Sequence, residues 1–138
     1  MTQLRWRGPA LVDVLAVVLF VVLGRASHHH TETARGIAST AWPFASGLGA
    51  GWLLLAAAGR RRGAGRRRGR AVSPSSLPAG AAVCVTTVAV GMALRVVAGQ
   101  GTAPAFVGVA TGFLGAVMLA GRVALGVTGR RLARAGRN

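Results

Sequence analysis

Long uncharged stretches alternate with clusters of arginine along this 138-residue chain. Arg35 and Arg60 enclose 24 uncharged residues, Arg70 and Arg95 enclose another 24, and Arg95 and Arg122 enclose 26. A helix needs ~20 apolar residues to cross the hydrocarbon core of a bilayer. The pattern therefore predicts transmembrane helices at about 38–59, 77–98 and 104–126.

A further apolar stretch precedes these three and contains one charged residue. It lies between Arg7 and Arg25 and includes Asp13. A cleaved signal peptide is an alternative interpretation. Two charged residues argue against cleavage: Asp13 lies within the apolar stretch, and Arg25 lies within the candidate cleavage site. They favour a retained helix at about 9–25. We expect an all-α, polytopic membrane protein, a single membrane domain over residues 1–138 built as a bundle of four transmembrane helices.

The arginines are distributed unevenly between the two ends of the predicted helices. Fourteen fall in the N-terminal segment, an Arg/Gly-rich loop at 60–73, and the end of the last helix with a basic tail at 127–138. Three belong to the opposite side. Since cytoplasmic loops carry the excess of Lys and Arg, both termini and the loop at 60–73 are predicted to face the cytoplasm from an inner (plasma) membrane.

The overall composition agrees with a membrane protein. Hydrophobic residues make up 52% of the chain, and 17 cations against two acids give a formal net charge of +15. A soluble domain typically has about 25% charged residues of both signs, which excludes that class here. The arginines at 60–73 suit anionic lipid headgroups; RNA is a weaker alternative because aromatic residues are missing there, so no nucleic acid is expected as a partner.

Small residues recur at the spacing that lets membrane helices approach closely. Gly47 and Gly51 form such a pair in the second predicted helix. The last helix carries a ridge of small residues at four-residue intervals, consisting of Gly108, Gly112, Ala116, Ala120 and Ala124. Both features are predicted helix-packing surfaces, within the bundle or between the subunits of a homo-oligomer.

Asp13 is the one acidic residue inside a predicted span. At 1.5 Å per residue, it lies ~6 Å inside the first helix, and Arg122 lies ~6 Å inside the last. An unpaired charge is costly at this depth. We expect Asp13 and Arg122 to form an intramembrane ion pair that brings the first and last helices together. The alternative is that each faces headgroup water separately.

Polar residues gather where the predicted helices reach the outer face. This candidate outer site comprises Arg25, Ser27, His28, Trp42, Arg95, Gln100 and Thr102. Arg95 could hold an anion with help from the glycine-rich turn that follows it, or its side chain could simply extend to the interface. Pro43 is expected in the first turn of its helix; the alternative is a kink that lines a cavity.

Enzymatic and metal chemistry have weak support. Cys84 is the only cysteine, and adjacent histidines at 28–30 with Glu32 do not converge readily on one ion. No catalytic constellation or phosphate-binding loop is apparent. No enzymatic activity, metal or cofactor is expected.

Several short strings together resemble a known family. They are Gly24-Arg25-Ala26-Ser27-His28, then Thr40-Ala41-Trp42-Pro43-Phe44, and Gly91-Met92-Ala93-Leu94-Arg95 followed by Gly99-Gln100-Gly101-Thr102-Ala103. Over about residues 10–125 the chain resembles the small prokaryotic membrane proteins of the domain of unknown function 3054 family. The resemblance implies four membrane helices and brings no activity.

Taken together, these patterns predict a non-enzymatic structural or interaction protein of the inner membrane with a polar outer site. The alternative is a small oligomeric transporter or channel subunit that uses Asp13 and the outer arginines.

Overall fold

The computed structural model describes residues 4–26, 34–64 and 73–135. Four helices account for nearly all of this: α1 (Leu4–Ala26), α2 (Ala34–Ala64), α3 (Leu77–Val97) and α4 (Pro104–Ala135). All four are long and apolar enough to cross a membrane. The described part of the chain is therefore all-helical, and the protein is a multi-pass membrane protein, as predicted.

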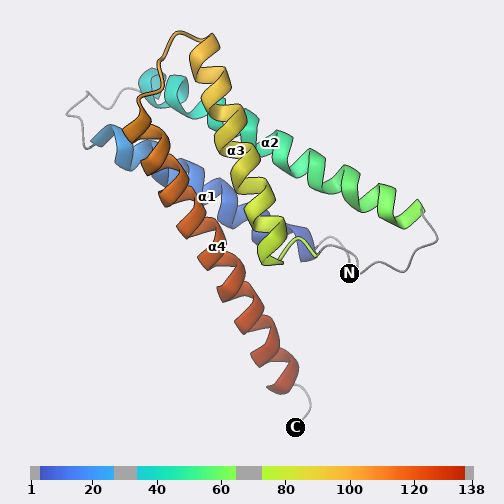
Figure 1. Ribbon diagram of the computed structural model, residues 1–138. Coiled ribbons are helices and arrows are strands. Elements are labelled where there is room, and N and C mark those ends of the chain that lie inside the picture. The colour runs from blue at the N-terminus through green and yellow to red at the C-terminus, as the bar shows by residue number, and fades with distance from the viewer. Residues whose placement is uncertain (1–3, 27–33, 65–72, 136–138) are drawn as a thin grey trace.

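The helices run up and down in chain order, and each packs against its neighbours (Figure 1). α1 contacts α2 and α4, and α3 contacts α2 and α4. One end of the bundle, here called the Arg95 end, is where α1 and α3 finish and α2 and α4 begin. The opposite end, where α1 begins and α4 continues toward the C-terminus, is here called the Arg122 end.

Each helix buries one face at the helical period. In α4 this face repeats every four residues through Ala110, Leu114, Met118 and Arg122. In α3 it includes Val83, Cys84, Thr87 and Val88. Large apolar side chains on the outward faces, such as Leu11 and Leu53, stay more than 60% exposed. Apolar surface on this scale suits contact with lipid tails rather than water.

The predicted glycine pair in α2 is confirmed as a packing surface. A Cβ atom at Gly47 would lie 2.5 Å from the carbonyl oxygen of Thr87, and one at Gly51 would lie 3.2 Å from the Cα of Val83. The backbones of α2 and α3 therefore meet directly at these two positions. Glycine has no side chain, and this allows the backbones of the two helices to approach so closely.

The predicted ridge of small residues in α4 does not pack within the bundle. Gly108, Gly112 and Ala116 are exposed, and a Cβ atom at either glycine would face open space. The reason is rotational: Arg122 must face α1 and α3 to be buried, and this turns the ridge outward. The other expectation, packing between subunits, remains a prediction.

Three helices extend further than the hydropathy pattern predicts. α1 begins at Leu4 rather than near 9. α2 begins at Ala34 rather than near 38 and continues through Ala64, so the predicted loop at 60–73 begins as helix. α4 continues to Ala135 rather than ending near 126. Arginine is a good helix former, so the helix does not stop where the apolar segment stops. The far half of α4 projects away from the other helices (Figure 1).

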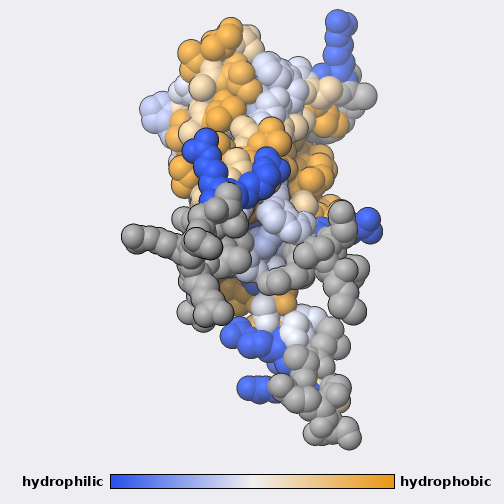
Figure 2. Space-filling view, turned by 90° about the vertical axis from the view of Figure 1, so that its right-hand side faces the viewer, coloured by the Kyte–Doolittle hydropathy of each residue, from blue (hydrophilic) through white to orange (hydrophobic). Residues whose placement is uncertain are grey.

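Hydrophobic and charged residues separate along the bundle. On the face shown in Figure 2, hydrophobic residues cover most of the upper part, where one hydrophilic side chain also projects, and the other hydrophilic residues lie at mid-height and toward the projecting end of α4. Arg130, Arg131 and Arg134 are exposed on that part of α4. The predicted basic tail is therefore helical over most of its length.

The α2–α3 contact predicts a position-specific effect of alanine substitution. Gly47→Ala should reduce stability by about 1–3 kcal/mol, because the new methyl group would collide with the backbone at Thr87. Gly49→Ala is the matched control: its Cβ would meet nothing within 4 Å, and alanine is the better helix former. Unfolding of the detergent-solubilised protein, followed by circular dichroism, would compare them. Equal stability of the two variants would contradict the close contact.

Candidate functional site

Arg95 is held at the end of α3 by the turn that follows it. Its Nε donates to the carbonyl oxygen of Gly101 at 3.3 Å, its Nη1 donates to Oε1 of Gln100 at 3.0 Å, and its Nη2 donates to the carbonyl oxygen of Gln100 at 3.3 Å. The turn reverses sharply because Gly99 and Gly101 have φ angles of 67° and 71°. Glycine adopts this left-handed region without a steric penalty.

Gln100 also ties the turn to α2. Its Nε2 donates to the carbonyl oxygen of Ser39 at 2.9 Å. In a continuous helix this carbonyl would accept from the backbone nitrogen of residue 43, but Pro43 has no N–H. Pro43 therefore frees an acceptor, and Gln100 occupies it.

This arrangement corrects the sequence interpretation of Pro43. The residue lies inside α2, well beyond the first turn, because the helix begins at Ala34. Proline in a membrane helix is tolerated where another group satisfies the freed carbonyl. Here that group comes from the turn between α3 and α4.

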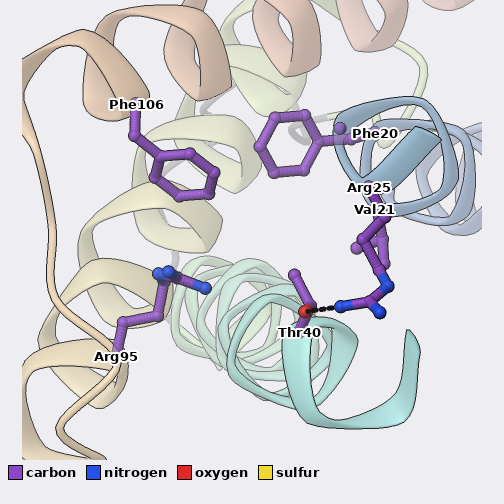
Figure 3. Close-up of a pocket in the computed structure, with 7 residues that line it drawn as sticks. Phe20, Val21, Arg25, Thr40, Arg95 and Phe106 are labelled. Carbon is purple, nitrogen blue, oxygen red and sulfur yellow. Dashed lines mark hydrogen bonds between the residues drawn. The ribbon is translucent and has the colours of Figure 1, made fainter. Parts of the chain in front are cut away.

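A cavity of about 330 Å³ lies beside Arg95 at this end of the bundle. All four helices contribute to its lining (Figure 3): Phe20, Val21 and Arg25 from α1, Thr40 from α2, Arg95 from α3 and Phe106 from α4. We call it the Arg95 cavity. The guanidinium of Arg95 lies 4.5 Å from the centroid of the Phe106 ring, which is a favourable cation–π distance.

Thr40 and Arg25 meet on the opposite side of the Arg95 cavity. Nη1 of Arg25 lies 3.5 Å from Oγ1 of Thr40 (Figure 3). The Thr40 hydroxyl donates in turn to the carbonyl oxygen of Gly36 at 3.1 Å. The cavity thus presents two guanidinium groups and a hydroxyl among aromatic and aliphatic side chains.

A second cavity, of about 680 Å³, adjoins the first toward the start of α4. Its lining includes Gln100 and Thr102 together with Phe20, Arg95 and Phe106. We call it the side cavity. Four residues of the predicted outer site, Arg25, Arg95, Gln100 and Thr102, therefore line these two connected spaces.

Other members of the predicted outer site do not join this group. Trp42 is 43% exposed and lines neither cavity, because its side chain lies on the outward face of α2. Ser27 and His28 lie outside the described residues, as do the other loop histidines and Glu32.

Sequence reasoning missed the aromatic and hydroxyl parts of the site. Phe20, Phe106 and Thr40 all line the Arg95 cavity. Thr40 and Phe106 stand close to predicted site residues in the sequence, which was a usable signal. Phe20 sits within a uniform apolar run and carries no such signal.

Four phenylalanine rings form a cluster at the Arg95 cavity, and two of them, Phe20 and Phe106, line it. The centroid of the Phe20 ring lies 5.1 Å from that of Phe44, 5.7 Å from that of Phe106 and 6.0 Å from that of Phe113. Tilted and edge-on contacts of this kind are favourable for aromatic pairs. We call these rings the phenylalanine cluster.

Asp13 and Arg122 lie beyond the phenylalanine cluster, toward the Arg122 end. Nη2 of Arg122 donates to Oδ2 of Asp13 at 2.8 Å, and Nη1 donates to Oδ1. Nη1 also donates to the carbonyl oxygen of Met118 at 3.2 Å. Both side chains are buried. The predicted intramembrane ion pair is confirmed in a bidentate form, the stronger arrangement for arginine and carboxylate.

Two glycines allow close packing around this ion pair. A Cβ atom at Gly80 in α3 would collide with Cδ and Nε of Arg122, and one at Gly121 in α4 would collide with Val12 in α1. α1, α3 and α4 therefore close around the pair.

The comparisons with known proteins identify the family. A family described as proteins of unknown function (DUF3054) matches residues 10–125. No curated protein and no solved structure matches the chain. The chain belongs to the DUF3054 family, as the sequence resemblance predicted.

The ion pair predicts a non-additive response to mutation. Asp13→Asn and Arg122→Gln should each destabilise the protein by about 3–5 kcal/mol, because each leaves an uncompensated buried charge. The double variant should lose less than the sum, by about 0.5–3 kcal/mol. Unfolding of the protein in detergent measures all three. Arg130→Gln, at an exposed position of the same helix, is the control and should change little. Strict additivity would argue against the pair.

Proposed function

We propose that this protein is a non-enzymatic plasma-membrane protein that binds an anionic group in the Arg95 cavity. The observation that carries the proposal is the guanidinium of Arg95, which borders a cavity and is held there by neutral oxygen atoms. A cation near the end of a membrane helix gains from a negatively charged partner. An anionic ligand would supply it.

The hydrogen bonding of Arg95 supports this proposal. A guanidinium has five N–H donors, and three of them reach the oxygens of Gln100 and Gly101. Two donors thus remain, on Nη1 and Nη2. The only carboxylate among the described residues, Asp13, is paired with Arg122. The fixed turn orients the Arg95 guanidinium before any ligand arrives.

The second guanidinium favours an anion over a neutral ligand. Arg25 lines the same cavity from α1, so positive charge borders the space from two helices. Two arginines that converge on one site are the usual means of recognising phosphate or carboxylate groups. The rings of Phe20 and Phe106 favour a ligand that also has an apolar part.

The chemistry of the lining supports binding rather than catalysis. Catalysis by a hydroxyl requires an adjacent general base. The Thr40 hydroxyl instead donates to a backbone carbonyl, and the groups around it are guanidinium and hydrocarbon. These groups can orient a ligand and neutralise its charge.

The transporter alternative requires Asp13 to be reachable from the Arg95 cavity. Asp13 is buried and paired with Arg122. It lies ~18 Å from Arg25 along α1, with the phenylalanine cluster between them. This geometry favours the binding function over conduction.

The arginine distribution orients the site. The excess of arginine at the Arg122 end supports a cytoplasmic location for both termini and for the Arg/Gly-rich loop, where anionic headgroups would be partners. The Arg95 cavity would then open at the outer face. A ligand would reach it without entering the cell.

Reporter fusions test this orientation. Alkaline phosphatase, which is active only outside the cytoplasm, should be active when fused within residues 29–31 or after Gly101. It should be silent when fused at Gly65 or Asn138. An active fusion at Asn138 would contradict the four-span arrangement with both ends inside.

Anion binding is tested with phenyl phosphate, a soluble ligand with one anionic and one aromatic part. It should raise the unfolding temperature of the detergent-solubilised protein in a saturable manner, whereas phenol should not. Arg95→Gln should weaken the binding at least tenfold, because it removes a charged donor. Arg131→Gln removes the same charge from an exposed position of α4 and should retain binding. Equal effects of the two substitutions would indicate non-specific attraction and contradict the site.

A further inference from the structure

The Arg95 cavity and the side cavity form one continuous hollow. Phe20, Gly24, Arg95 and Phe106 line both of them. A Cβ atom at Gly24 would meet nothing within 4 Å, so the space between α1 and α4 is open at this point. A ligand held by Arg95 can therefore extend into the side cavity.

The side cavity opens onto the membrane-facing surface of the bundle. Ala105 and Val109 line it from α4. Both are exposed, and Val109 has 62% of its surface accessible. Val109 lies five residues into α4, which corresponds to ~7.5 Å below the start of the helix at Pro104. The opening therefore reaches into the depth occupied by lipid tails.

Polar and apolar groups are separated along this hollow. Arg25, Thr40 and the guanidinium of Arg95 surround its inner part, and in Figure 3 the guanidinium of Arg95 points toward Thr40 beneath the Phe106 ring. In the side cavity, the polar residues Gln100 and Thr102 lie at the turn before α4, and Ala105 and Val109 line it further along α4. A ligand that fits both parts has an anionic head and an apolar chain.

The position of Arg95 matches the depth of a lipid headgroup. It lies two residues before the end of α3 at Val97, and arginine side chains at this level reach the interface. A lipid of the same leaflet would bring its phosphate to this depth without leaving the bilayer.

We propose that the ligand is an anionic phospholipid of the outer leaflet, with its phosphate at Arg95 and one acyl chain leaving between α1 and α4 through the side cavity. This inference rests on the proposed anion-binding function and adds the lipid nature of the anion and its lateral route of entry. The charge on Arg95 favours anionic over zwitterionic lipids, and the apolar surface of the side cavity adds affinity for an anion that carries an acyl chain.

Native mass spectrometry of the detergent-solubilised protein tests the proposal, with phosphatidylglycerol and phosphatidylcholine as probes. The wild-type protein should retain one phosphatidylglycerol at least tenfold more tightly than phosphatidylcholine. Arg95→Gln should lose this preference, and Arg131→Gln, the charge-matched control, should keep it. Equal retention of the two lipids by the wild-type protein would overturn the proposal.

A second pair of variants tests the lateral route and does not alter the charge. Ala105→Phe fills the side cavity and should weaken phosphatidylglycerol binding about tenfold. It should leave phenyl phosphate binding within twofold, because Ala105 does not line the Arg95 cavity. Val123→Phe, at an exposed position of the same helix that lines neither cavity, is the control and should bind both ligands normally.

The two proposals fail in different ways. If phenyl phosphate binding depends on Arg95 but phosphatidylglycerol binding depends on neither Arg95 nor Ala105, the lipid proposal is wrong and the anion site stands. If neither ligand depends on Arg95, both are wrong. Equal losses of phosphatidylglycerol binding in Ala105→Phe and Val123→Phe would also exclude the lateral route.

Discussion

The hydrocarbon core of a bilayer contains no water, so each polar group of a membrane-spanning helix must be satisfied by a partner within the protein. This constraint accounts for two contacts in the bundle: the ion pair of Asp13 with Arg122, and the hydrogen bond of Gln100 to Ser39. Asp13 and Arg122 satisfy one another across α1 and α4, and Gly80 leaves the space in which the guanidinium lies. Because Arg122 must turn inward, the rotation of α4 is fixed, and so is the choice of its lipid-facing side.

The same constraint builds the site at the opposite end. Pro43 cannot donate to Ser39, and the carbonyl left over would be unsatisfied at the edge of the membrane. Gln100 takes this acceptor with its amide nitrogen and uses its amide oxygen to hold Arg95. A missing backbone hydrogen in α2 thus determines where a guanidinium on α3 points. Gln100 does this with both ends of a single amide group.

The sequence predicted the parts of this structure that follow from strong, one-dimensional signals. Four apolar segments bounded by arginine predict four helices, and Asp13 had one cation at its own depth to pair with. Helix ends were less predictable, since arginines extend α2 and α4 after the apolar segments finish. The sequence left open whether the small-residue ridge of α4 packs within the bundle or between subunits, because spacing alone cannot show which way a face of the helix is turned. The contact between Gln100 and Ser39 joins residues 61 positions apart, which no local pattern reveals.

α4 is longer than the bilayer core is thick, so it extends well beyond the point where it contacts α1. Its 32 residues span ~48 Å, against about 30 Å for the hydrocarbon core. The contact of Gly121 with Val12 of α1 divides the helix into two arms: ~18 Å to Val109 on one side and ~21 Å to Ala135 on the other. A rotation of 10° about this fulcrum displaces the tip by about 4 Å, given these arm lengths. If α4 moves as a rigid body about this point, widening between α1 and α4 at the side cavity would move the arginine-bearing tip in the opposite direction, on the far side of the membrane.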